Sequence, residues 1–251
     1  MESTTSLKAR ASMAARWAVV MATALLALGQ FSCASMGITP EHTTMPAARA
    51  GLRPQYRVFY DELGDNGDWV LIQPYRFVFR PKARFGNWSP YFDGFWSPSD
   101  SYGWVWVSSE PYGWATYHYG RWLQDDYQGW VWVPGLEWAP AWVAWNSNDQ
   151  YVGWAALSPS NTPTNGFHVV ARGDLGTTDL RSKMVPTEQV SEIVQKTQPI
   201  KNYDQVDHVT VNLGPRIEWV EQVTGPLTRA RVQDLVPFGK HIRTQRRLPG
   251  G

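Results

Sequence analysis

Acidic side chains in the aromatic-rich middle of the sequence are the best candidates for catalysis. Asp125 or Asp126, paired with Glu137, would provide the acid and the base that glycoside hydrolysis requires. The two aspartates, however, fall between Trp122 and Trp130, where we expect a hairpin turn, and aspartate is a common turn former. The turn interpretation is therefore preferred, and an unrecognised glycoside hydrolase stays as an alternative.

Two further residues near this segment invite a chemical role but have simpler structural explanations. Glu137 stands beside a tryptophan, and we expect it to be buried and to form a hydrogen bond or a salt bridge, for example with Arg121. His118 lies between Tyr117 and Tyr119, which predicts a strand residue packed among rings rather than a general base. Neither residue by itself predicts an enzyme.

Metal and nucleotide chemistry find no support in the sequence. The histidines are isolated from one another, and there is no HExxH motif, P-loop, GxGxxG turn or GxSxG elbow. We therefore predict no metal, no cofactor and no enzymatic activity. The five histidines are His42, His118, His168, His208 and His241.

The charge balance argues against a nucleic-acid partner. The chain of 251 residues has 23 basic and 22 acidic side chains. Three of the basic residues and one of the acidic residues lie in a predicted targeting segment, which leaves 20 basic and 21 acidic residues in the mature chain. A near-neutral domain lacks the clustered Lys and Arg side chains that bind nucleic acid.

The N-terminal segment is typical of a bacterial secretory signal. Residues 17–28 form an apolar run that follows Arg16, and the run is too short to cross a bilayer as a helix. Translation from Met13 instead of Met1 would give a signal of conventional proportions, so both starts stay open. We expect an exported protein, located in the periplasm or at the outer membrane.

Cys33 is the only cysteine, and it stands where bacterial lipoproteins are cleaved and acylated. The match to a lipobox is partial, because Ser32 fits the pattern whereas Gln30 replaces the usual leucine. Cleavage after Ala34 is the alternative and would release the protein without its cysteine. We predict lipidation at Cys33 and contact with the membrane through that anchor only.

A unit of 26 to 27 residues occurs three times between Trp69 and Trp154, the stretch that holds 13 of the 15 tryptophans. In each copy, a Gly-x-Trp segment is followed, eight residues after its tryptophan, by a short run of aromatic residues and valines. This period predicts stacked antiparallel β-hairpins. The paired segments are GDW (67–69) with FVF (77–79), GFW (94–96) with WVWV (104–107), and GRW (120–122) with WVWV (130–133).

These motifs resemble a family of exported bacterial proteins of uncharacterised function that repeat patterns such as YGWVWVP, WAPYHYGRW and EWAPAWV. The resemblance extends over about residues 56–232, and Thr116 stands where the family commonly has proline. It implies an exported, β-rich envelope protein and names no substrate. The main matching segments are YGWVWV (102–107), WATYHYGRW (114–122), GWVWVPGLEWAPAWVAW (129–145) and YVGWAALSP (151–159).

We predict an all-β fold of repeated antiparallel hairpins, arranged as a meander, an open sheet or a barrel-like sheet, with a short helix in a C-terminal extension. That helix is expected at residues 216–224, closed by Gly225, and residues 187–196 are a further helical candidate. The expected segments are a signal peptide with a possible lipobox (1–33), a tether (34–54), a Trp-rich β-repeat domain (55–160), the extension (161–235) and a disordered tail (236–251).

The repeated tryptophans suit two different roles. They would stack across strands in a core, where each aromatic pair contributes about 0.5–1.5 kcal/mol beyond its burial. Alternatively, exposed indole faces would bind the sugar rings of peptidoglycan or another envelope polysaccharide. Solvent exposure separates the two roles. The candidate ligand-binding residues are Trp104, Trp106, Trp130 and Trp132.

We therefore expect a non-catalytic structural or assembly module of the cell envelope. Its partners would be envelope proteins or envelope polysaccharides. A glycan-binding module is the main alternative.

Overall fold

Three antiparallel hairpins with a common register form the first part of the fold, as the repeat predicts. The computed structural model describes residues 53–82, 88–99, 101–206 and 208–235. The hairpins are β1 (Gly67–Ile72) with β2 (Arg76–Pro81), β3 (Gly94–Pro98) with β4 (Trp104–Ser108), and β5 (Arg121–Asp125) with β6 (Gly129–Val133). In each, the repeated tryptophan faces an aromatic residue of the partner strand. The facing pairs are Trp69 with Phe79, Trp96 with Trp106, and Trp122 with Trp132.

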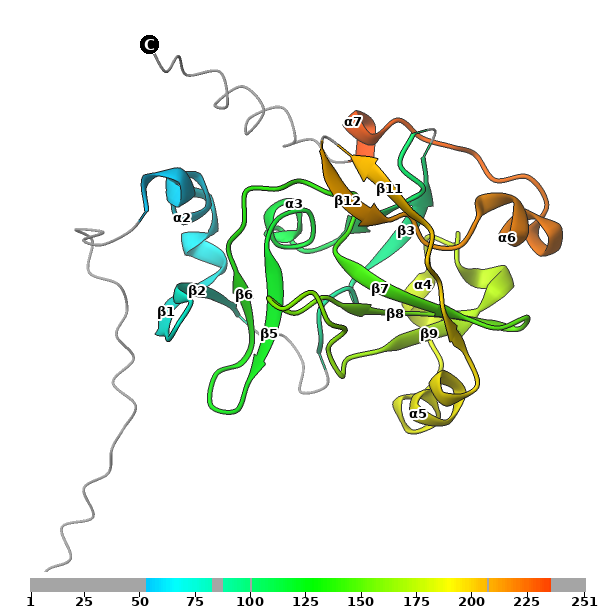
Figure 1. The fold of residues 1–251 in the computed structure, drawn as a ribbon, viewed down its shortest axis with the longest axis horizontal. Helices are drawn as coiled ribbons and strands as arrows, with labels where there is room; N and C mark the ends of the chain where they lie inside the picture. Colours follow the sequence, from blue (N-terminus) through cyan, green and yellow to red (C-terminus); the bar gives the residue numbers. More distant parts are fainter. Residues whose placement is uncertain (1–52, 83–87, 100, 207, 236–251) are drawn as a thin grey trace, which may run out of the picture. The chain divides into compact units, whose positions relative to one another are not determined.

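The three hairpins are equivalent in register but do not join into one sheet. The first and third share a sheet of order β1-β2-β6-β5, in which Phe79 pairs with Trp132 (Figure 1). The middle hairpin forms a two-stranded sheet of its own. Irregular segments supply partners for its backbone, because the amide of Trp106 donates to the carbonyl of Pro140. The repeat therefore specifies hairpins and leaves open how they pack together.

A second four-stranded sheet joins the Trp-rich region to the region that follows it. Its order is β10-β7-β8-β9, and Trp145 of β7 faces Trp154 of β8. The strands are β7 (Val143–Ser147), β8 (Tyr151–Ala156), β9 (His168–Ala171) and β10 (Gln198–Pro199). The last two strands, β11 (Tyr203–Val206) and β12 (Val209–Asn212), form a separate hairpin. Residues after 160 thus complete a sheet that begins within the Trp-rich region (Figure 1).

The two longest described helices lie where the sequence predicts them. These are α5 (Thr187–Gln195) and α6 (Ile217–Thr224). Gly225 closes α6 with a φ of 76°, and its amide donates to the carbonyl of Glu221. No helix within the described ranges is long and apolar enough to cross a membrane. The shorter helices are α2 (Arg57–Leu63), α3 (Gly113–Thr116), α4 (Leu180–Lys183) and α7 (Val232–Leu235), with the 3-10 turns η1 (Pro54–Tyr56), η2 (Gly64–Asn66) and η3 (Arg172–Asp174).

The core is built mainly from aromatic rings. The ring centroid of Trp96 lies 5.0 Å from that of Trp106, in an edge-on geometry, and 4.3 Å from that of Trp145, in a tilted geometry. Such geometries are favourable for aromatic pairs. Val170 and Val220, which follow the Trp-rich region, belong to the same core. The tryptophans that are essentially fully buried are Trp96, Trp104, Trp106, Trp122, Trp132, Trp145 and Trp154.

Two glycines of the third hairpin allow a test of how closely its strands are packed. Gly120 and Gly129 have φ values of +67° and +69°. A Cβ atom on Gly120 would lie 2.1 Å from the carbonyl oxygen of Val133, whereas a Cβ atom on Gly129 would meet nothing within 4 Å. We expect Gly129→Ala to lower the free energy of unfolding by about 1–2 kcal/mol through backbone strain alone. Gly120→Ala should lower it by about 3 kcal/mol or more, because the neighbouring strand must also move.

Urea unfolding of both variants, followed by tryptophan fluorescence, measures the two losses. Gly129→Ala is the matched control, since it carries the same strain without the contact. Equal losses in the two variants would contradict the packing described for Gly120.

Candidate functional site

Three of the four tryptophans predicted to bind a ligand lie inside the core. Trp104, Trp106 and Trp132 have no more than 1% of their surface exposed. The indole N–H groups of Trp104 and Trp132 donate to backbone carbonyls within the protein. Trp130 keeps partial exposure. The structure therefore has no platform of four exposed indoles, because both the facing strand and the irregular segments cover these rings.

Cys33, the predicted lipidation site, lies outside the described residues. The same holds for the signal peptide, nearly all of the tether and the C-terminal tail. Lipidation at Cys33 stays a prediction from the sequence.

The predicted acid and base have separate structural surroundings. Asp125 ends β5, and its Oδ1 accepts hydrogen bonds from the amides of Tyr127 at 2.9 Å and Gln128 at 2.8 Å. This Asx-turn geometry confirms the turn interpretation. Glu137 is exposed, so the expectation that it is buried is wrong, and within the described ranges it forms no salt bridge with Arg121. Its segment runs along the surface after β6.

His118 is packed among rings, as predicted, but it does not lie in a strand. Its ring is 2% exposed and lies parallel to Trp138, with centroids 5.9 Å apart. The amides of Tyr117 and Tyr119, on either side of His118, donate to carbonyls four residues earlier, and this helical pattern overrides the strand tendency of the tyrosines. Nδ1 of His118 lies 3.0 Å from the carbonyl oxygen of Ala139. Burial lowers the pKa of His118 to about 4.

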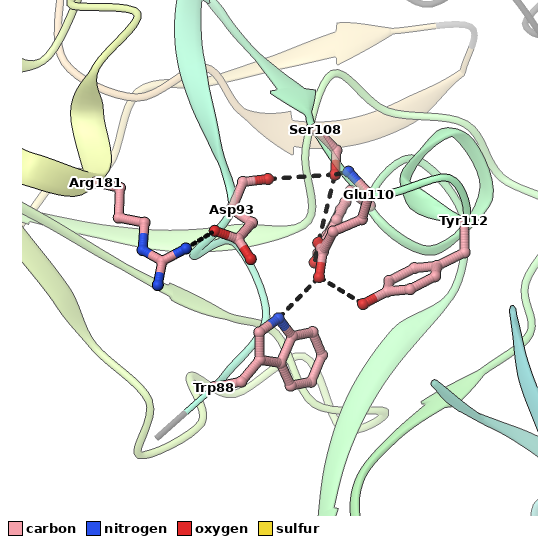
Figure 2. A network of polar contacts seen from close by, with 7 residues as sticks. Trp88, Asp93, Ser108, Glu110, Tyr112 and Arg181 are labelled. Atoms are coloured by element: carbon pink, nitrogen blue, oxygen red, sulfur yellow. Dashed lines mark hydrogen bonds and ion pairs between the residues drawn. The ribbon is translucent and has the colours of Figure 1, made fainter. Parts of the chain in front are cut away.

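A buried carboxylate, not singled out in the sequence, sits at the centre of a polar network. Glu110 follows β4 and is 6% exposed. It accepts hydrogen bonds from Nε1 of Trp88 at 2.8 Å and from the hydroxyl of Tyr112 at 2.5 Å (Figure 2). The hydroxyl of Tyr117 donates to its second oxygen. The backbone amide of Glu110 donates to Oγ of Ser108 at 3.0 Å. Glu110 thus joins its own segment, which includes Tyr112 and Tyr117, to the distant segment of Trp88.

The surroundings of Glu110 favour its neutral form. Burial raises the pKa of Glu110, and this effect outweighs the opposing effect of the hydrogen bonds from Tyr112, Tyr117 and Trp88. The charge of Asp93 raises that pKa further. Asp93 is itself bonded to Arg181 at 2.8 Å (Figure 2).

A groove of about 530 Å³ runs along β7 and β12, and the side chain of Arg121 lines it. The guanidinium carbon of Arg121 lies 3.4 Å from the ring centroid of Trp142. Nε of Arg121 donates to Oδ1 of Asn161 and Nη1 donates to the carbonyl of Gly120, both at 2.8 Å. Burial lowers the pKa of Arg121, but an arginine stays protonated in proteins. The arrangement presents a fixed positive charge to the groove.

A second groove, of about 560 Å³, is lined by α5 and the start of β9 and contains a Ser–His contact. Nε2 of His168 lies 3.0 Å from Oγ of Ser89 and 3.1 Å from the carbonyl oxygen of Pro90. A carbonyl oxygen only accepts, so Nε2 carries the proton and donates to Pro90. In that tautomer His168 cannot take the proton of the serine hydroxyl, and the pair is not an activated nucleophile.

In residues 53–82, 88–99, 101–206 and 208–235, no group of three His, Cys, Asp or Glu side chains is placed to hold a metal. A mixed polar and aromatic groove such as that of Arg121 is the usual setting for an organic ligand.

The comparisons with known proteins concern the repeat region. Residues 60–161 match the model of a family described as "Family of unknown function (DUF6600)". That match begins in α2 and ends after β8, so it spans all three hairpins and excludes β9 onward. It is consistent with the resemblance to an uncharacterised family noted in the sequence. A search of curated proteins and a search of solved structures gave no match.

The two buried histidines are expected to make the fold sensitive to acid. The folded-state pKa of His118 and of His168 is lowered from 6.5 to about 4 by burial. Their contribution to stability is therefore present above about pH 6.5 and is lost as the pH falls toward 4. The loss should reach about 1.4 kcal/mol per pH unit for each histidine. Urea unfolding between about pH 7.5 and about pH 4.5 measures it.

His118→Gln should reduce this dependence, and His168→Gln should reduce it in the same way. Glu110 acts in the opposite direction, so its contribution must first be subtracted. If the wild-type protein were then equally stable at both ends of the pH range, the histidines would not be buried in their neutral form.

Glu110 should act in the opposite direction. Because its folded-state pKa is raised, its contribution is present below the unfolded value of about 4.5 and is lost as the pH rises through the folded value. Glu110→Gln keeps the size and one acceptor oxygen but does not titrate. The stability of this variant relative to the wild type should therefore increase with pH above about 4.5.

Glu110→Leu is the comparison variant, since it removes the carboxylate to which Trp88, Tyr112 and Tyr117 donate. It should cost about 2–4 kcal/mol below about pH 4.5, and this cost should shrink as the pH rises, because leucine, like glutamine, does not titrate. If the difference between Glu110→Gln and the wild type did not vary with pH, Glu110 would not have a raised pKa.

Proposed function

We propose that the protein is a non-catalytic structural or assembly module of the bacterial cell envelope, exported and lipid-anchored through Cys33. The observation that carries the structural role is the burial of the repeated tryptophans. Trp96 and Trp122 take corresponding places in the first strands of two hairpins, and both are essentially fully buried. Trp106 and Trp132, which face them from the second strands, are buried as well. The repeated residue type thus serves the core, which is the role expected of a scaffold.

The side chains best suited to chemistry are engaged in structural contacts, and this supports the non-catalytic role. Glu110 accepts three hydrogen bonds from aromatic side chains, and Asp125 holds the β5–β6 turn. A glycoside hydrolase would need two carboxylates facing one cleft. Of Asp125, Asp126 and Glu137, only Glu137 lines the groove of Arg121.

The type of core also suits a protein that works outside the cytoplasm. With one cysteine in the whole chain, no internal disulfide can stabilise the fold. Aromatic packing and buried hydrogen bonds between distant segments replace it, as in the bond from Trp104 to the carbonyl of Pro215. A fold stabilised in this way does not depend on the redox state of its compartment.

Export and anchoring are tested by labelling the producing bacterium with a palmitate analogue and separating its fractions. We expect the full chain in the envelope fraction, cleaved and carrying the label, and Cys33→Ser unlabelled and no longer held at the membrane. Ser35→Ala is the matched control and should behave as the wild type. Export without label would overturn the anchor alone, and an uncleaved chain in the cytoplasm would overturn the envelope role.

The non-catalytic role is tested in the same strains after deletion of the chromosomal copy, with envelope permeability as the readout. The double variant Asp125→Asn and Asp126→Asn keeps a turn-forming pair and removes both predicted acids. It should restore the wild-type barrier fully. Failure of this variant, with its fold intact by circular dichroism, would overturn the non-catalytic role.

A further inference from the structure

The guanidinium of Arg121 is held in a fixed position with part of its hydrogen-bonding edge unused. Its Nε and Nη1 atoms donate to Asn161 and Gly120, and its plane packs on Trp142. Among the described residues, no carboxylate lies within ion-pair distance of it, and its Nη2 atom has no partner. The charge of Glu137 acts on this half-buried guanidinium only from beyond ion-pair distance, and an anionic ligand in direct contact would offset more of the cost of burial.

The backbone around Asn161 is shaped to hold this arrangement. Asn161 has a φ of 58°, a left-handed conformation that asparagine tolerates better than most residues. Its amide donates to the carbonyl of Ser158, which forms a tight turn after β8. The turn delivers the Asn161 side chain to Nε of Arg121. The guanidinium is therefore oriented before any ligand arrives, which reduces the entropic cost of binding.

The lining of the groove selects the kind of anion. Arg121 is the only basic residue among those that line it, and Glu137 is the only acidic one. A single planar guanidinium suits a carboxylate, whereas a doubly charged phosphate would face Glu137 with one cation to balance it. The remaining polar lining is neutral, which suits a ligand rich in hydroxyl groups. These neutral polar residues are Asn146, Asn161, Tyr203, Thr210 and Asn212.

An exposed aromatic ring completes the groove. Tyr203 of β11 lines it and has 61% of its surface exposed. Such a ring offers an apolar face, and its hydroxyl can bond a ligand at the rim. The flat apolar face of a sugar ring fits this surface better than a flexible aliphatic acid does.

We propose that the groove along β7 and β12 binds a carboxylate-bearing saccharide, with Arg121 on the carboxylate and Tyr203 against the sugar ring. This goes beyond the structural role proposed above and does not require it. Glu137, Oδ1 of Asn146 and Nδ2 of Asn161 then bond the hydroxyl groups of the sugar, since the opposite ends of these two amides are engaged within the protein. The groove contains none of the buried repeat tryptophans Trp104, Trp106 and Trp132.

The test is a titration of the full chain, purified in detergent, with glucuronate, followed by saturation-transfer NMR. Glucose is the neutral sugar, acetate the carboxylate without a ring, and inorganic phosphate the competing anion. We expect glucuronate to bind about tenfold tighter than glucose or more, which is the effect of one charge-assisted contact. Neither acetate nor phosphate should displace it at equal concentration.

Two pairs of variants locate the site. Arg121→Lys keeps the charge but loses the planar fork, and it should weaken glucuronate binding about tenfold. Arg172→Lys is its matched control, because Arg172 also lies over an indole, 4.1 Å from the ring centroid of Trp219, but outside the groove. Tyr203→Ala should weaken binding several-fold, and Tyr127→Ala, at a 94% exposed position in the β5–β6 turn, should not.

The outcomes are decisive in both directions. Equal binding of glucose, displacement by acetate or phosphate, or no binding of glucuronate would each overturn the proposal. Wild-type affinity in Arg121→Lys would also overturn it. If Arg121→Lys fails to fold, Tyr203→Ala decides, since an exposed ring can be removed without loss of the core. These results are independent of the localisation and permeability experiments, so failure of one proposal does not count against the other.

Discussion

Hydrogen bonds from several buried indole N–H groups fix irregular segments of the fold. An N–H group left without a partner in the interior costs about 1–3 kcal/mol. Here turns and connecting segments direct their carbonyl groups inward to meet tryptophans from other elements. The resulting bonds run from Trp104 to Pro215, from Trp122 to Thr116, from Trp132 to Tyr119, from Trp142 to His118, and from Trp154 to Tyr91. Strands and turns are thus stabilised by the same aromatic side chains.

The sequence predicts the hairpins because they depend on local spacing. A Gly-x-Trp segment, a turn and an aromatic run lie within about 20 residues, and the same register follows in all three copies. The exposure of the tryptophans could not be predicted in this way. Trp104 to Val107 is apolar on both faces, so periodicity does not reveal which face the core covers. The isolation of β3–β4 has the same origin, since its backbone partners, such as Pro140, lie far along the chain.

The candidate sites could not be predicted from the sequence for a related reason. Glu110 stands before a proline, in a segment typical of a surface turn, yet its donor Trp88 lies 22 residues away. Arg121 was expected to pair with Glu137, whereas its side-chain partner Asn161 lies 40 residues further on. Burial and partnership of a charged residue are set by tertiary contacts, which no local pattern encodes. The turn role of Asp125 was predictable because the amides that donate to it lie within three residues.

The bond from Trp104 to Pro215 joins residues 111 positions apart. A growing chain leaves the ribosome from its N-terminus, so the hairpin of Trp104 emerges long before the carbonyl that its indole requires. Until then that edge of the core stays open to water and to other chains. The Trp-rich region alone therefore lacks part of its core, and the later residues complete that core during synthesis. Any shortened version that ends before Pro215 would keep this vulnerable surface permanently.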